Sequence, residues 1–105
     1  MNNKIEFYIP EDQKIPTRLR LKKGNTHIYY ERLTDKFGYE FELYNLDSQE
    51  QGEEIVREIV NIMCNQSYDH GQEWRVVSID CIEFNDNNWS KSGKWQVEFR
   101  IRDSY

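Results

Sequence analysis

Two cysteines and two histidines carry the soft-ligand chemistry of this 105-residue sequence. A set of Cys64, His70, Cys81 and His27 would be chemically adequate for zinc, which binds four sulfur and nitrogen ligands. Structural zinc sites take their ligands in close pairs, whereas Cys64 and His70 are separated by five residues and the other two ligands are distant in the chain. Lone buried cysteines usually behave as small apolar residues. We therefore expect no metal and no cofactor.

Cys64, Asp69 and His70 are also the residue types of a thiol nucleophile with its base and an orienting acid. Asp69 and His70 are neighbours, so their side chains would diverge, and no glycine-rich oxyanion loop accompanies Cys64. We interpret Cys64 as a helix-end thiol packed under a loop, and we predict no catalytic residue. The alternative is a small ligand-binding domain or enzyme that uses the concave sheet face with Cys64, His70 or Cys81. That alternative requires an accessible thiol of low pKa.

An aromatic and acidic surface is the third candidate. In a strand over 37–44, Glu40 and Glu42 point to one side and the apolar side chains point to the other. Trp89 lies in the asparagine-rich segment 85–91, where a loop has no core to bury it. Exposed tyrosine and tryptophan are typical of protein–protein contact surfaces. We expect Trp89, Tyr44, Glu40 and Glu42 to bind a partner protein; the alternatives are a solvated acidic face and a ring folded back over its own sheet edge.

Apolar alternation predicts six strands. They are expected over residues 4–9, 17–22, 27–33, 37–44, 74–84 and 94–102. The core face of the third strand is open between two sets, which are Ile28 with Tyr30, or His27 with Tyr29 and Leu33. The segment 74–84 has apolar residues on both faces, which predicts either a central strand or a strand whose bulge switches faces.

One helix is expected over about 48–65, followed by a polar loop over 66–73. Asp47 or Ser48 offers the N-cap oxygen, and Glu50 or Gln51 completes the capping-box spacing. Apolar residues form one helical stripe: Ile55, Val56, Ile59, Val60, Ile62 and Met63. A one-sided sheet and a one-sided helix bury each other. The fold class is therefore α+β, with a mainly antiparallel sheet of five to six strands, one helix packed on one face, and the order β-β-β-β-α-β-β.

Length and composition indicate a single domain over 1–105. Five Phe, seven Tyr and three Trp compensate for an apolar fraction of 37%. The net charge of -5 argues against binding to nucleic acid or to an anionic membrane. The charge is uneven, because residues 1–30 contain six basic and three acidic residues, whereas residues 31–58 contain three basic and nine acidic ones. Pairing of solvent-facing charges between neighbouring strands would account for this pattern.

No segment has the apolar length of a signal peptide or a membrane span. We therefore expect a cytoplasmic protein whose two thiols are reduced. Because no residue set amounts to a catalytic signature, we interpret the chain as a small acidic binding module of the immunity, inhibitor or adaptor type, of bacterial or phage kind. Its expected partner is another protein, of basic charge. A homodimer formed through 74–84 or 94–102 is a further alternative.

Overall fold

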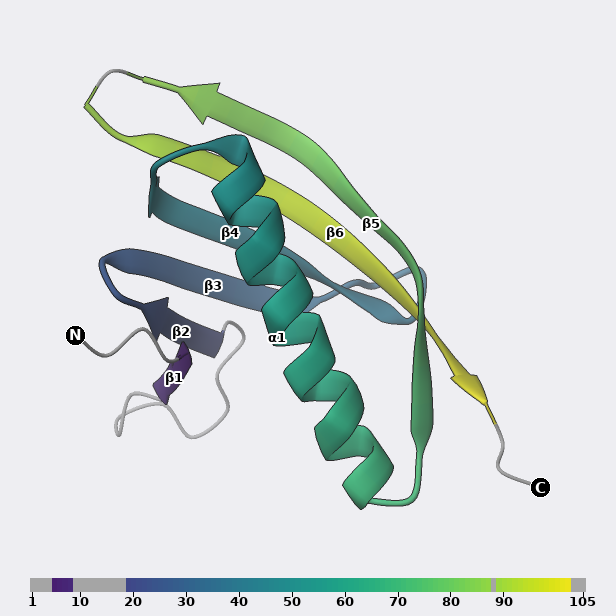
Figure 1. Cartoon of the computed structure of the whole chain (residues 1–105). Helices are drawn as coiled ribbons and strands as arrows, with labels where there is room; N and C mark the ends of the chain where they lie inside the picture. Colours follow the sequence, from purple (N-terminus) through teal and green to yellow (C-terminus); the bar gives the residue numbers. More distant parts are fainter. Residues whose placement is uncertain (1–4, 9–18, 88, 103–105) are drawn as a thin grey trace.

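The computed structural model describes residues 5–8, 19–87 and 89–102, which form six strands and one helix (Figure 1). In chain order the elements are β1 (Ile5–Tyr8), β2 (Leu19–Lys23), β3 (Thr26–Arg32), β4 (Gly38–Leu46), α1 (Gln49–Asp69), β5 (Glu73–Asp86) and β6 (Lys91–Arg102). The predicted class, an antiparallel sheet with one helix, and the predicted order of elements are confirmed.

The strands form one sheet in the order β1-β2-β3-β4-β6-β5, and each neighbouring pair is antiparallel. Because β6 lies between β4 and β5, those two strands run in the same direction. Strands that run in the same direction need a long crossover, and α1 supplies it by passing over one face of the sheet (Figure 1). The last strand of the chain therefore lies inside the sheet, under the helix.

The alternation of side chains decides which face of the sheet α1 covers. The buried side chains of three inner strands are Thr26, Ile28 and Tyr30 on β3, Phe41, Leu43 and Leu46 on β4, and Trp95, Val97 and Phe99 on β6. The first of the two sets considered for the third strand is therefore the correct one. Polar residues between these positions, such as Glu42, Lys94 and Gln96, belong to the opposite face of the sheet.

Side-chain hydrogen bonds begin the helix where the sequence predicts. Ser48 is the N-cap, and its Oγ accepts a hydrogen bond of 3.0 Å from the Gln51 backbone N–H. The Gln51 side chain accepts in return from the backbone N–H of Asp47, at 2.6 Å. The buried helix residues are Gly52, Ile55, Val56, Ile59, Val60 and Met63. The predicted stripe is thus confirmed apart from Ile62, which is half-buried.

The helix ends four residues later than predicted, at Asp69, so the expected loop over 66–73 is wrong in its first half. Gly71 has a φ of 84°, the left-handed conformation that glycine adopts without steric penalty. The Gln72 N–H then bonds to the Ser67 carbonyl at 2.9 Å, and the Gly71 N–H bonds to the Tyr68 carbonyl at 3.0 Å. These two bonds form a Schellman motif, which terminates helices regardless of where the apolar stripe stops.

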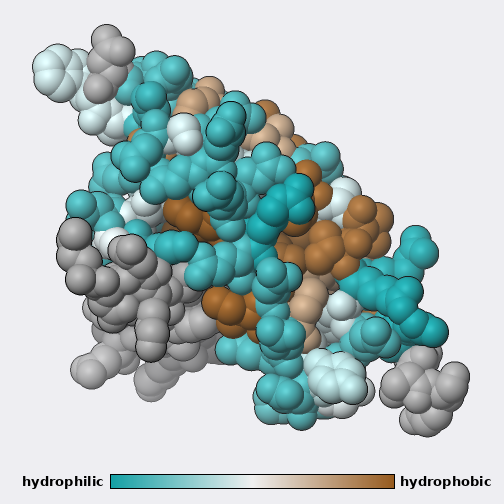
Figure 2. All heavy atoms as spheres, viewed as in Figure 1, coloured by the Kyte–Doolittle hydropathy of each residue, from teal (hydrophilic) through white to brown (hydrophobic). Residues whose placement is uncertain are grey.

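β5 lies at the edge of the sheet and is bulged, so a central position for this strand is wrong and the bulge alternative is correct. Its register with β6 shifts between Val76 and Ser78 and again between Cys81 and Glu83. Each shift adds one unpaired residue and moves the apolar positions by one, which explains why apolar residues occur on both faces in the sequence. Figure 2 shows apolar surface beside α1 along β5; the exposed apolar residues of β5 and β6 are Val76, Val77, Ile82 and Ile101.

The helix meets the sheet at the indole ring of Trp95, which is fully buried. A Cβ placed on Gly52 of α1 or on Gly93 of β6 would overlap this ring. Two glycines, one from each element, therefore make room for the largest buried side chain of the described residues. Close packing of this kind leaves no space for one more methyl group.

We expect Gly52→Ala to lower the free energy of unfolding by about 1–2 kcal/mol, because overpacking a core outweighs the roughly 1 kcal/mol that alanine adds to a helix over glycine. Urea unfolding measures the change. Asn61→Ala, at an exposed position of the same helix, is the control and should be neutral or stabilising. In a double-mutant cycle with Trp95→Phe, the loss caused by Gly52→Ala should shrink; a stabilised Gly52→Ala variant would contradict the packing argument.

Candidate functional site

Three of the four residues predicted to contact a partner follow one face of β4, and the fourth lies in the turn between β5 and β6. Glu40, Glu42 and Tyr44 are on β4 and belong to the face opposite α1, since Phe41 and Leu43 between them face the helix. Trp89 is in the turn between β5 and β6, and its side chain is 98% exposed. Tyr44 pairs with Ser92 at the start of β6, so Trp89 and Tyr44 lie at the same end of the sheet.

Two tyrosine rings are held together on this face. Tyr29 of β3 and Tyr44 of β4 pack edge to face, with ring centroids 5.8 Å apart. The Tyr44 hydroxyl donates a hydrogen bond of 2.7 Å to Glu42 Oε2, and Glu42 is directly opposite Tyr29 in the β3–β4 register. Rings fixed in this way lose little conformational entropy when a partner covers them, which favours binding.

Two carboxylates face each other beside these rings. Glu31 of β3 is directly opposite Glu40 of β4. Glu40 accepts a hydrogen bond of 3.2 Å from Gln96 Nε2, but in the described part of the chain neither Glu31 nor Glu40 takes part in an ion pair. Like charges directly opposite each other in a sheet are destabilising.

We call the surface formed by Tyr29, Glu31, Glu40, Glu42 and Tyr44 the tyrosine–glutamate patch. Sequence reasoning identified its β4 members but missed Tyr29 and Glu31 on β3. The signal for both was the choice of core face for that strand: once Ile28 and Tyr30 point inward, Tyr29 and Glu31 must point outward.

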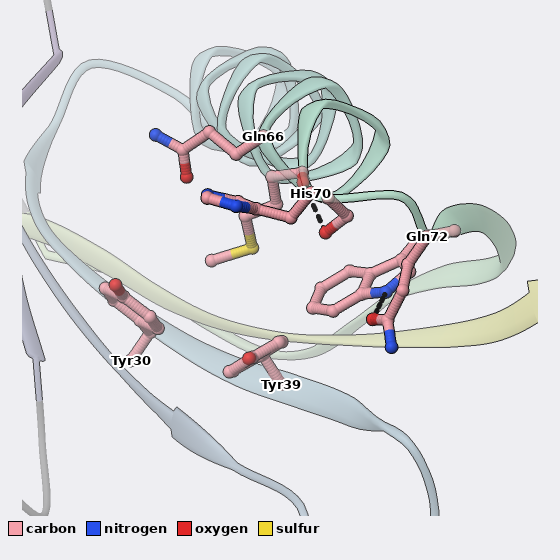
Figure 3. Close-up of a pocket in the computed structure, with 8 residues that line it drawn as sticks. Tyr30, Tyr39, Gln66, His70 and Gln72 are labelled. Carbon is pink, nitrogen blue, oxygen red and sulfur yellow. Dashed lines mark hydrogen bonds between the residues drawn. The ribbon is translucent and has the colours of Figure 1, made fainter.

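A second candidate site, which is concave, lies on the helix-covered face. It is a groove of about 570 Å³ between the last turns of α1 and the sheet. Three aromatic side chains, Tyr30, Tyr39 and Trp74, come from the sheet, and the other described lining residues are Met63, Gln66, Ser67, His70 and Gln72. Figure 3 shows Gln66 and His70 projecting from the helix over the strands that carry Tyr30 and Tyr39.

The two cysteines and the histidine considered for a catalytic site are not brought together. Cys81 lies near Gln49 and Glu53 in the first turns of α1. Cys64 follows Glu53 by eleven residues, roughly 17 Å along a helix. His70 lines the groove, whereas neither cysteine does. No group of three or more Cys, His, Asp or Glu side chains with metal-binding geometry occurs among the residues that the structure describes.

Both thiols are half-buried and unpaired with each other. Burial raises the pKa of the Cys64 thiol, and burial is also the main cause of the raised pKa of Cys81. A thiol with a raised pKa is protonated at neutral pH and is a poor nucleophile. The alternative that needs a reactive Cys/His site therefore lacks the low thiol pKa that it requires.

Comparisons with known proteins give no relative from which a function could be inferred: no family model matches the chain, and neither a curated protein nor a solved structure matches it. Within the described ranges, no helix has both the length and the apolar character that crossing a membrane demands.

We expect iodoacetamide to alkylate both cysteines at pH 8 at least about tenfold more slowly in the native protein than in urea, because burial limits access and raises both pKa values. Mass spectrometry of proteolytic peptides follows each site separately. The single variants Cys64→Ser and Cys81→Ser confirm the assignment. Native alkylation of either thiol at the rate seen in urea would restore the Cys/His alternative.

Proposed function

We propose that this protein is a non-enzymatic, cytoplasmic binding module that contacts a basic surface of a partner protein through the tyrosine–glutamate patch and Trp89. The observation that carries the proposal is the facing pair of Glu31 and Glu40 beside the Tyr29–Tyr44 ring pair. The free, unbridged state of both cysteines is compatible with a reducing compartment.

Several carboxylates on this sheet face lie opposite or near a cation, whereas in the described part of the chain Glu31 and Glu40 do not; a second like-charged pair, Arg75 opposite Arg100, occurs in the β5–β6 register. Lys94 of β6 is opposite Glu42 on one side and Glu83 on the other, and Lys36 lies 3.6 Å from Glu98. Opposite charges on neighbouring strands, as around Lys94, are ordinary sheet chemistry. The Glu31–Glu40 pair lowers the stability of the free protein, and a cation from a partner would remove that repulsion on binding.

The neighbouring rings suit the same kind of partner. An arginine guanidinium pairs with carboxylates through a planar fork and also stacks on aromatic faces. The patch offers carboxylates and tyrosine rings side by side. Trp89 contributes almost none of its surface to the core, so nearly all of its ring is available to a partner. Tryptophan, tyrosine and arginine are the residues that most often dominate binding energy at interfaces.

We expect Glu40→Gln to raise the free energy of unfolding by about 0.2–1 kcal/mol, because it removes one of two facing charges and keeps an acceptor for Gln96. Thermal or urea unfolding checks this. Glu83→Gln is the matched control: it removes a carboxylate opposite Lys94 and should not stabilise the protein. A destabilised Glu40→Gln variant would show that the pair carries no repulsion.

Affinity capture with the tagged protein, at low and high salt, tests the proposed function. We expect a basic partner that the wild type retains at low salt and loses at high salt, since exposed charge pairs are screened. Simultaneous Glu40→Lys and Glu42→Lys should abolish capture. Glu54→Lys with Asp69→Lys makes the same change in net charge at exposed helix positions and should not.

Trp89→Ala provides a charge-independent check in the same experiment. It should leave the unfolding curve unchanged, because the ring is almost wholly exposed, and weaken the captured complex roughly tenfold, as interface tryptophans often do. Equal capture by the patch variant and its control, together with a silent Trp89→Ala, would eliminate this face as the binding surface.

A further inference from the structure

We propose that the groove between the end of α1 and the sheet binds a neutral, planar small molecule of the aromatic-amide or nitrogen-heterocycle class. The groove lies on the helix-covered face, away from the tyrosine–glutamate patch, so this site is independent of the proposed protein partner. Its volume of about 570 Å³ is within the usual range for small-molecule sites, roughly 300–1,000 Å³.

Aromatic rings form the floor of the groove. Tyr30, Tyr39 and Trp74 come from three different strands. Tyr30 and Tyr39 pack edge to face at 5.8 Å between ring centroids, and Tyr39 and Trp74 are inclined by 28° at 6.5 Å. Tyr39 and Trp74 are only half-buried, so part of each ring faces the groove. A floor of several rings favours a flat ligand that can stack on it.

Amide and imidazole groups form the opposite wall. Gln66 and His70 are four residues apart and therefore share one side of α1. Both side chains reach over the aromatic floor (Figure 3). Within the described part of the chain, neither side chain makes a hydrogen bond, whereas Ser67 donates to the Met63 carbonyl and Trp74 donates to Gln72. Each free group has both donor and acceptor capacity, which an amide or a ring nitrogen of a ligand would satisfy.

The lining selects for a neutral ligand. Charged residues make up 31% of the sequence, yet the described lining contains no Asp, Glu, Lys or Arg. Burial, with a smaller effect from Tyr39, raises the pKa of Tyr30 to about 12, so this phenol stays uncharged even where an ordinary tyrosine would ionise. A charged ligand would lose hydration here without gaining an ion pair.

The turn that builds the wall adds little to the core. The buried residues of α1 end at Met63, although the helix continues to Asp69. Over this last part Ser67 is half-buried, and Gln66 and His70 are exposed. Helices in proteins are stabilised mainly by burial of an apolar face. The Schellman motif holds this last part of α1 in place although it buries little apolar surface. Its polar side chains lie over the aromatic floor, as expected for one wall of a ligand-binding groove.

A matched pair of probes tests the site: nicotinamide, and cyclohexanecarboxamide, which keeps the amide but has a saturated ring. We expect nicotinamide to cause saturable shifts in ¹H–¹⁵N spectra at Gln66, His70 and the Trp74 indole, with a Kd in the range of about 1–10 mM. Cyclohexanecarboxamide should bind about tenfold more weakly, because it cannot stack. Absence of saturable shifts with nicotinamide up to about 50 mM, or equal binding of both probes, would overturn the proposal.

The variant Gln66→Ala with His70→Ala shows whether the polar wall takes part. Both side chains are exposed, so the fold should persist, and nicotinamide affinity should fall about five- to tenfold when their hydrogen bonds are lost. Asn65→Ala, an exposed neighbour outside the lining, is the matched control and should bind like the wild type. Unchanged affinity in the double variant, or shifts located at Tyr44 and Glu42 instead, would refute the assignment.

Discussion

The packing of Trp95 against two glycines holds the helix to the sheet. The ring is fully buried, and neither Gly52 of α1 nor Gly93 of β6 could carry a Cβ beside it. β6 lies between β4 and β5, the two strands that α1 connects. The contact therefore anchors the crossover helix to the strand beneath it. Because Gly52 is in the second turn of α1, the start of the helix is tied closely to the sheet, and the direction of α1 determines where its last turns lie.

Both candidate sites follow from this arrangement. The first turns of α1 bury their apolar stripe, whereas the last turns run past the buried core over Tyr39 and Trp74 and leave the groove. The same face assignment sends Tyr29, Glu31 and Glu40 to the opposite side of the sheet. The alternation of side chains along the paired strands β3 and β4 therefore places the rings of the groove on one face of the sheet and the carboxylates on the other. The covered face supplies an aromatic groove whose described lining lacks Asp, Glu, Lys and Arg, and the other face supplies a charged surface with two fixed tyrosine rings.

Local patterns were enough for most of the fold. Alternation in β4 and β6 identified the faces of both strands, and Ser48 with Gln51 marked the start of the helix. The end of the helix was missed because a Schellman motif at Gly71 extends it beyond its last buried residue. The position of β5 was left open, because two bulges shift its apolar positions by one residue each, and only pairing with β6 shows where the shifts occur.

The sequence by itself determined which residues are apolar, which are charged, and the order of the elements, because these depend on periods of two and 3.6 residues along the chain. It therefore predicted that Glu40 and Glu42 would share a face. Only the tertiary structure decided what lies beside them: Tyr29 and Glu31 come from another strand, and the groove joins residues from α1 and three strands. Pairing register and helix direction depend on contacts between distant segments, such as Trp95 with Gly52, which no local pattern encodes.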